Sequence, residues 1–142
     1  MEIYTKTKEE TIKFGTELAN SLKSGDILCL EGELGAGKTT LVKGLAKGLG
    51  INEEILSPTF VLMNIHEIKN NKKNIEQVVH IDTYRLKNEE ELLDIGAEDY
   101  LGAPNTICVI EWPEKIAGLL KGKKVITVKI EHAEGGRKIT VK

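Results

Sequence analysis

The chain has 142 residues, and we expect residues 1–142 to form one compact domain around a single core. Apolar residues make up 40% of the chain and charged residues 30%, a composition that is typical of globular proteins and excludes a disordered chain. Lys and Arg number 20 against 22 Asp and Glu, so the net charge of −2 lacks the basic excess of a free-standing nucleic-acid binder.

The first half of the chain predicts the order helix, strand, loop, helix. Thr7 and Glu10 have the spacing of a capping box before a helix that ends at residues 24–26. Residues 27–30 are continuously apolar, which is typical of a strand covered on both faces. A glycine-rich loop then leads into a helix over residues 39–49, where apolar residues recur at helical spacing before Gly50.

The second half predicts strands near the edges of a sheet. Residues 60–68 and 75–82 are expected to pair around a polar turn, and Asn88 and Glu91 frame a short helix. A buried strand follows at residues 106–111, then a helix over residues 113–120 that begins at Pro113, and a closing hairpin of residues 125–130 and 138–141. This order predicts an α/β fold: a three-layer domain with a mixed, largely parallel central sheet and antiparallel edge hairpins.

The cysteines and the N-terminus bear on the compartment. Cys29 and Cys108 lie in apolar runs, outside any Cys-x-x-Cys pair, and are expected in the core. No stretch approaches the roughly 18 apolar residues that a membrane-spanning helix needs. Residues 1–6 lack the apolar segment of a signal peptide. We therefore expect a cytoplasmic protein without a membrane partner, monomeric when isolated.

Residues 32–39, with the sequence Gly-Glu-Leu-Gly-Ala-Gly-Lys-Thr, satisfy the Walker A pattern of a P-loop. In that pattern, backbone N–H groups wrap phosphates at a helix N-terminus, the lysine reaches the terminal phosphates and the hydroxyl holds Mg2+. Gly35 and Gly37 permit a close approach of phosphate that a side chain would block. Lys38 is expected to be a solvated donor, and Thr39 to reach the metal. The pattern predicts a P-loop NTPase-like domain that binds ATP and Mg2+, whereas a chance glycine-rich loop is the alternative.

Two carboxylates end apolar strands, Asp82 and Glu111. A P-loop site needs an acid for the magnesium shell and a group that orients the attacking water. Glu111 ends the more continuously buried strand and suits the metal, which leaves Asp82 for the water or an outer-shell contact. Each can instead be a solvated strand-end acid. His80 should point to the same side as Asp82 and orient it, or be a satisfied core histidine.

Other polar groups are weaker candidates. The loop at residues 57–59, Ser-Pro-Thr, lies where nucleotide switches often place a hydroxyl, although a simple turn is the alternative. Arg85 and Arg137 are the only arginines. P-loop enzymes often use an arginine to stabilise negative charge in the transition state. Arg137 can equally decorate a hairpin. Trp112 follows Glu111 and either senses the site or packs in the core.

Four segments together resemble the motif set of the TsaE (YjeE) family: residues 32–40, Ser-Pro-Thr-Phe at 57–60, His-Ile-Asp-Thr-Tyr-Arg at 80–85 and Glu-Trp-Pro at 111–113. The match runs in order from about Thr11 to Arg137. The resemblance implies a small bacterial P-loop ATPase that acts with the TsaB and TsaD proteins in threonylcarbamoyladenosine modification of tRNA, at the adenosine following the anticodon. It implies that tRNA is reached indirectly, through that complex. Because the chain has only two arginines, we expect hydrolysis to be weak without the partners.

Carried over residue by residue, the resemblance implies Thr39 and Glu111 at the magnesium and Asp82 as a catalytic acid. Lys38, at the terminal phosphates, is also expected to be catalytic. Around the nucleotide, the Walker A pattern and the resemblance imply Thr11, Gly35, Ala36, Gly37, Lys38, Thr39, Thr40, Thr59, Trp112 and Arg137.

The main alternative is a P-loop small-molecule kinase. Such enzymes usually need an arginine-bearing lid and an acceptor pocket, and two arginines leave little for both. A GTPase would carry an Asn-Lys-x-Asp stretch, whereas residues 71–74 read Asn-Lys-Lys-Asn and end in an amide. A non-catalytic binding module would require that Asp82 and Glu111 have no chemical role.

Overall fold

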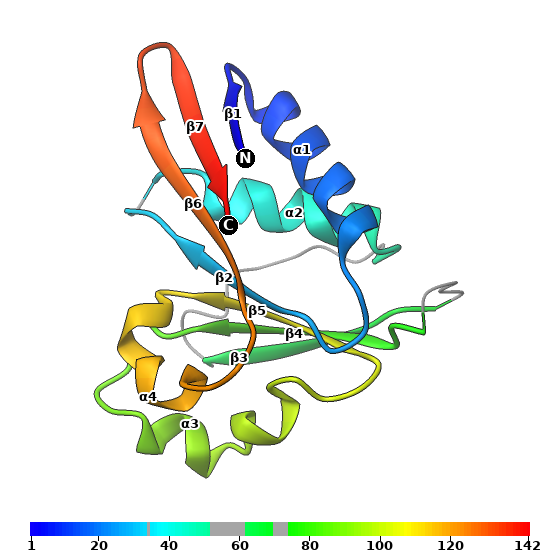
Figure 1. The fold of residues 1–142 in the computed structure, drawn as a ribbon, viewed down its shortest axis with the longest axis vertical. Coiled ribbons are helices and arrows are strands. Elements are labelled where there is room, and N and C mark those ends of the chain that lie inside the picture. Colours follow the sequence, from blue (N-terminus) through cyan, green and yellow to red (C-terminus); the bar gives the residue numbers. More distant parts are fainter. Residues whose placement is uncertain (34, 52–61, 70–73) are drawn as a thin grey trace.

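A seven-stranded sheet organises the chain, in the order β1-β7-β6-β2-β5-β4-β3 (Figure 1). The computed structural model describes residues 1–33, 35–51, 62–69 and 74–142. The strands are β1 (Glu2–Thr5), β2 (Ile27–Glu31), β3 (Met63–Glu67), β4 (Gln77–Asp82), β5 (Thr106–Glu111), β6 (Ile126–Ala133) and β7 (Gly136–Val141). The helices are α1 (Lys8–Ser21), α2 (Lys38–Gly48), α3 (Glu90–Asp94) and α4 (Ala117–Leu120), with 3-10 turns at Ala97–Tyr100 and Pro113–Ile116.

The pairing of the strands confirms the predicted mixed sheet. Strands β6, β2, β5 and β4 are neighbours and run parallel. Strand β3 pairs antiparallel with β4 at one edge, and β7 pairs antiparallel with β6 near the other. Strand β1, which the sequence did not predict, extends the second edge by pairing antiparallel with β7. Both predicted hairpins are therefore present, and one of them carries an additional strand from the far end of the chain.

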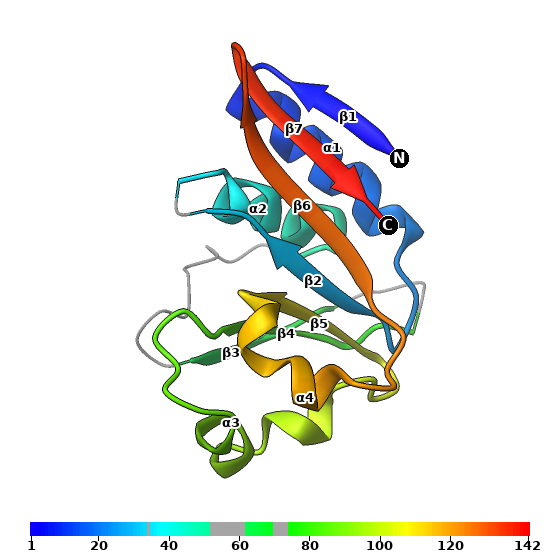
Figure 2. The same ribbon diagram turned by 60° about the vertical axis from the view of Figure 1, so that its left-hand side comes forward.

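Helices cover both faces of the sheet, which makes three layers. Helices α1 and α2 lie on one face, and α3, α4 and the 3-10 turns lie on the other (Figure 2). Alternate residues of β2 and β5 point into the two cores: Leu28 and Val109 pack under α1 and α2, while Cys29 and Ile110 pack on the opposite side. Burial on both faces explains why these strands read as continuous apolar runs.

Burial also determines the protonation state of both cysteine thiols. The side chains of Cys29 and Cys108 are 3% and 0% exposed, as predicted for core residues. Burial raises the pKa of the Cys29 thiol to about 11 and that of the Cys108 thiol to about 12. Both are therefore neutral thiols at physiological pH.

Helix α1 crosses α2, the helix that follows the glycine-rich loop, at close range. Among the described residues, a side chain at Gly44 would meet the carbonyl oxygen of Ile12 inside van der Waals contact, and a Cβ at Gly15 would lie 2.7 Å from the carbonyl oxygen of Leu41. Thr16 Oγ1 donates to the carbonyl oxygen of Gly44 at 3.2 Å. The glycines therefore allow the two backbones to touch.

The predicted capping box at the start of α1 is present in altered form. The side chain of Thr7 accepts a hydrogen bond from the backbone N–H of Glu10 at 3.1 Å. The carboxylate of Glu10 reaches back to the backbone N–H of Lys6, at 2.6 Å, instead of to that of Thr7. The N-terminus of α1 is therefore stabilised from both directions.

Two predicted elements differ in extent. The helix expected over residues 113–120 is divided: Ile116 leaves the helical region, with φ −126° and ψ 32°, while its side chain is fully buried, so a 3-10 turn is followed by the single turn of α4. Strand β3 begins at Met63, and residues 60 and 61 of the predicted strand lie outside the described residues. Within the described ranges, no helix is long and apolar enough to cross a membrane.

Candidate functional site

The glycine-rich loop joins the end of β2 to the start of α2. Gly35 and Gly37 have positive φ angles of 79° and 109°, which residues with side chains rarely adopt, so the loop needs glycine there. Ala36 is buried, Thr40 is half-buried and Thr39 is exposed at the beginning of the helix. The arrangement presents the N-terminus of an eleven-residue helix, α2, beside an open loop, a geometry that favours anions.

Lys38 is buried, and the expectation that it is solvated is wrong. Its side chain is 6% exposed, and its Nζ donates to the carbonyl oxygen of Gly32 at 2.6 Å. The same Nζ lies 3.9 Å from the centroid of the Trp112 ring, a cation–π distance. Burial lowers the pKa of Lys38, while Glu111 and Asp82 oppose that shift by favouring the charged form. The ammonium is thus held in a fixed place next to the loop.

Asp82 and Glu111 lie side by side at the carboxyl ends of β4 and β5. The two residues are register partners, and they are 6% and 4% exposed. Asp82 Oδ1 accepts a hydrogen bond from the backbone N–H of Tyr84 at 2.9 Å. Glu111 is also the register partner of Leu30 on β2, so it lies on the strand next to the one that leads into the loop, and Asp82 lies one strand further away. Both acids are therefore buried neighbours of the loop and not solvated strand ends.

The hydrogen bond of His80 crosses to the neighbouring strand. Nε2 of His80 lies 2.7 Å from Oε2 of Glu111, and both side chains are buried. With Glu111 ionised, Nε2 carries the proton. Within the described part of the chain, Nδ1 of His80 has no hydrogen-bond partner. The sequence placed His80 on the correct face but assigned it to Asp82 of its own strand, whereas the structure pairs it with Glu111.

Glu111, Asp82 and Thr39 offer oxygen atoms that suit Mg2+. This ion takes oxygen ligands, keeps several waters and needs only one or two carboxylates when phosphates supply the rest. Glu111 uses Oε2 for His80, which leaves Oε1 for another partner. Nowhere in the described ranges do three or more His, Cys, Asp or Glu side chains converge as a metal site. Carboxylate and hydroxyl oxygens therefore fit a Mg2+ ion whose further ligands are phosphate oxygens and water.

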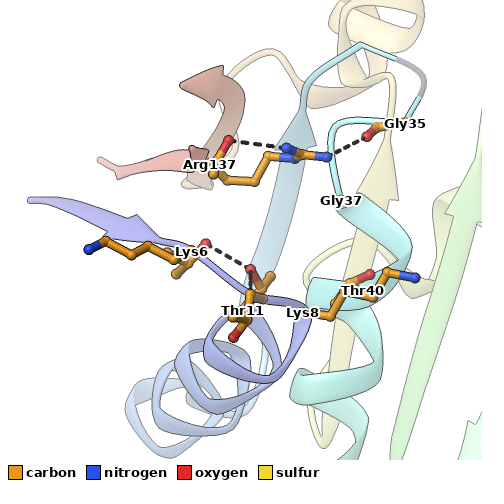
Figure 3. A pocket seen from close by; sticks show the side chains of 10 residues that line it. Lys6, Lys8, Thr11, Gly35, Gly37, Thr40 and Arg137 are labelled. Carbon is orange, nitrogen blue, oxygen red and sulfur yellow. Dashed lines mark hydrogen bonds between the residues drawn. The ribbon is translucent and has the colours of Figure 1, made fainter. Parts of the chain in front are cut away.

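A cavity of about 200 Å3 opens on the other side of the loop (Figure 3). We call it the side pocket; it is lined by Thr5, Lys6, Thr7, Lys8, Thr11, Gly35, Gly37, Thr40, Gly136 and Arg137. The hydroxyl oxygens of Thr5 and Thr11 are hydrogen-bonded to each other at 2.8 Å. A side chain at Gly136 would meet the carbonyl oxygen of Thr5, so the β6–β7 hairpin and the end of β1 are in close contact. Sequence reasoning missed Thr5 and Lys6, because the lining they provide depends on β1, and it assigned no role to Lys8 at the start of α1.

Arg137 braces the loop from β7. Its Nε donates to the carbonyl oxygen of Ala36 at 2.8 Å. Its Nη2 donates to the carbonyl oxygen of Gly35 at 3.3 Å (Figure 3). These bonds tie the carbonyl groups of Gly35 and Ala36 to β7, and the backbone N–H of Ala36 donates to the carbonyl oxygen of Glu33 at 3.1 Å within the loop. Arg85, by comparison, is exposed after β4.

The structure brings most of the predicted site residues together around the loop. Thr11 and Arg137 lie on one side of it, and Asp82, Glu111 and Trp112 on the other, with residues 35–40 between them. The prediction for Thr59 and the loop at residues 57–60 falls outside the described residues. Two residues of the segment at 80–85 were given no role by the sequence analysis: Thr83, which is fully buried, and Tyr84, whose ring centroid lies 5.1 Å from that of Trp112.

Comparison with known proteins gives one family. The family model described as "Threonylcarbamoyl adenosine biosynthesis protein TsaE" matches residues 5–139. The chain is 39% identical over 142 residues to the tRNA threonylcarbamoyladenosine biosynthesis protein TsaE of Treponema pallidum (strain Nichols), covering 99% of both chains. It is 37% identical to the protein of the same name from Bacillus subtilis (strain 168), covering 96% of this chain and 81% of that one.

A solved structure agrees with these sequence matches. The crystal structure of YdiB from Bacillus subtilis superposes with a TM-score of 0.77 at 30% identity, covering 99% of this chain and 83% of that chain. The chain therefore belongs to the TsaE family of threonylcarbamoyl adenosine biosynthesis proteins.

Proposed function

We propose that the chain binds ATP with Mg2+ at the glycine-rich loop and hydrolyses it in support of threonylcarbamoyladenosine modification of tRNA. The observation that carries this proposal is the convergence of the Lys38 ammonium, the N-terminus of α2 and two buried carboxylates around one loop. An ammonium and aligned N–H groups attract phosphate, and carboxylates serve the metal and the water. The relatives named above are tRNA threonylcarbamoyladenosine biosynthesis proteins, and this similarity supports the assignment to that modification of tRNA.

Each side chain has a role that its position allows. Lys38 and the N–H groups of residues 35–40 bind the phosphates, and Thr39 and Glu111 would hold Mg2+, which neutralises phosphate charge when bound. Asp82 orients the attacking water and takes its proton as the bond from the γ-phosphorus to the bridging oxygen breaks, giving ADP and inorganic phosphate. The side pocket, with Thr11 and Arg137, receives the nucleoside part.

The arginines explain why we expect slow hydrolysis by the isolated chain. Arg137 donates to two loop carbonyls, so it braces the loop instead of reaching the terminal phosphate. Arg85 is exposed. P-loop enzymes gain orders of magnitude in rate from an arginine that stabilises the transition state, and that group can come from a partner. We propose that TsaB and TsaD are those partners, that tRNA is reached through the complex, and that the chain alone is a cytoplasmic monomer.

The test is ATP turnover by the purified chain, alone and with TsaB and TsaD. We expect turnover to rise at least tenfold in the complex, because the partners complete the site. An Asp82→Asn variant assembled into the same complex serves as the control and should not respond. Fast turnover by the chain alone, unchanged by the partners, would contradict the proposal that TsaB and TsaD complete the site. Phosphate transfer to a sugar or nucleoside in place of water would identify a small-molecule kinase.

A further inference from the structure

The backbone of Trp112 has an unusual conformation immediately after β5. Its φ of 59° and ψ of 53° lie in the left-handed region. For a bulky side chain this conformation is an outlier, and such outliers persist where the surrounding structure holds them. Pro113 follows and begins a 3-10 turn, so the chain reverses sharply at this residue. The turn therefore needs a partner that fixes it.

Thr83 is that partner. Its side chain is fully buried directly after β4, and its Oγ1 lies 3.0 Å from the carbonyl oxygen of Glu111 and 2.6 Å from that of Trp112. The backbone N–H of Thr83 also donates to the carbonyl oxygen of Glu111 at 3.2 Å. A threonine has one hydroxyl proton, which is shared between these two acceptors. Thr83 thus clamps both carbonyls that flank the left-handed residue.

The clamped turn directs the indole of Trp112 over the start of α2. Lys38 Nζ lies 3.9 Å from the ring centroid and also donates to the carbonyl oxygen of Gly32 at 2.6 Å. Tyr84 packs against the indole with its ring tilted by 42°. A long, flexible lysine side chain is therefore confined between a carbonyl group and an aromatic face.

We propose that Thr83 is a positioning residue for the P-loop lysine: it holds Trp112 in the left-handed turn, and the indole keeps the Lys38 ammonium at the phosphate site before nucleotide binds. The inference rests on the proposed nucleotide binding at this loop. An arriving phosphate replaces the Gly32 carbonyl as the acceptor for Lys38. Because the side chain is already ordered, little of its conformational freedom remains to be lost on binding.

The clamp is tested first on the ligand-free protein. Thr83→Val keeps the shape and removes the hydroxyl, and Thr83→Ser keeps the hydroxyl as a matched control. Since Trp112 is the only tryptophan, tryptophan emission reports on this turn. We expect a red-shifted emission and stronger acrylamide quenching in Thr83→Val, with values like those of the wild type in Thr83→Ser. Emission and quenching that stay unchanged in Thr83→Val would overturn the clamp.

The contact between Lys38 and Trp112 is tested by a double-mutant cycle that leaves Thr83 in place. Because the positioning role requires this contact, the cycle can overturn the proposal even if Thr83→Val does not fold. Lys38→Met and Trp112→Leu are made singly and together, and the unfolding equilibrium constant is measured without nucleotide. We expect the effects to be non-additive by about threefold or more, as a partly desolvated cation–π pair requires. Additive effects would overturn the contact.

Nucleotide affinity then separates positioning from mere structural support. We expect Thr83→Val to weaken Mg-ATP binding about fivefold, the effect of one lost hydrogen bond, and Thr83→Ser to restore it. If both variants are folded and bind Mg-ATP with the affinity of the wild type, the positioning role is overturned. A wild-type chain that binds no ATP would contradict the proposed function instead, while the ligand-free measurements would still report on the clamp.

Discussion

At the carboxyl ends of β4 and β5, two buried carboxylates differ in what their oxygen atoms contact. One carboxylate oxygen of Glu111 is hydrogen-bonded to the ring of His80, and Asp82 accepts a hydrogen bond from the backbone N–H of Tyr84. A carboxylate anchored by a histidine is held in a fixed orientation, as ligands of metal ions usually are. This difference supports Glu111 for the metal and Asp82 for the water.

Substitution of the two acids by their amides separates these roles. Glu111→Gln should weaken ATP binding about tenfold in Mg2+ and leave binding in EDTA nearly unchanged, because it removes a metal ligand. Asp82→Asn should keep the affinity for Mg-ATP and lower turnover in the complex by about a hundredfold, the usual loss of a general base. Calorimetry with and without Mg2+, followed by turnover assays, measures both. The reverse pattern would exchange the two assignments.

At the scale of elements, the crossing of α1 and α2 holds Thr11 close to the loop. Gly44 has no room for a side chain, because one would meet the backbone of Ile12. Helix propensity alone predicts that Gly44→Ala gains about 1 kcal/mol. The steric overlap predicts the opposite, a loss of roughly 1–3 kcal/mol, because backbone atoms cannot move aside cheaply.

Chemical unfolding measures whether Gly44→Ala raises or lowers the free energy of unfolding. Lys43→Ala, at an exposed position of the same helix, is the control and should change the free energy of unfolding by less than about 0.5 kcal/mol. We also expect a weaker affinity for ATP in Gly44→Ala, since the helices would separate next to the side pocket. A more stable Gly44→Ala variant would mean that the close crossing does not constrain the fold.

Sequence reasoning found the elements whose signals are local. The continuous apolar runs of β2 and β5 and the glycine-rich loop between β2 and α2 each follow from neighbouring residues. Strand β1 was missed because its partner, β7, lies at the other end of the chain and its four residues carry little pattern of their own. Because β1 was missed, the contribution of Thr5 and Lys6 to the lining of the side pocket was missed as well.

Details of the site were missed for the same reason. The burial of Lys38 depends on the left-handed turn at Trp112, which depends in turn on Thr83 from a different strand end. The bonds from Arg137 to the loop depend on the β6–β7 hairpin, which sequence spacing predicted without revealing what it touches. Contacts between distant segments are set by the packed sheet and leave no periodic signal.

At the scale of the whole molecule, one sheet joins the two cores, and we propose that residues 1–142 unfold as a single domain. Strands β2, β4 and β5 contribute to the core on each face, so neither core can be lost while the other persists. Urea unfolding followed by Trp112 emission and by far-ultraviolet circular dichroism should give coincident curves. Two separated transitions would show that the chain contains more than one cooperative unit.

The central claim, that the loop between β2 and α2 binds ATP through Lys38, is tested most directly by calorimetric titration of Mg-ATP into the wild type and into Lys38→Met. The account predicts saturable binding of one ATP to the wild type and a loss of at least about a hundredfold in affinity in the variant, because a buried charged donor to phosphate is removed. Circular dichroism should confirm that the variant is folded. Equal affinities in two folded proteins would contradict the account.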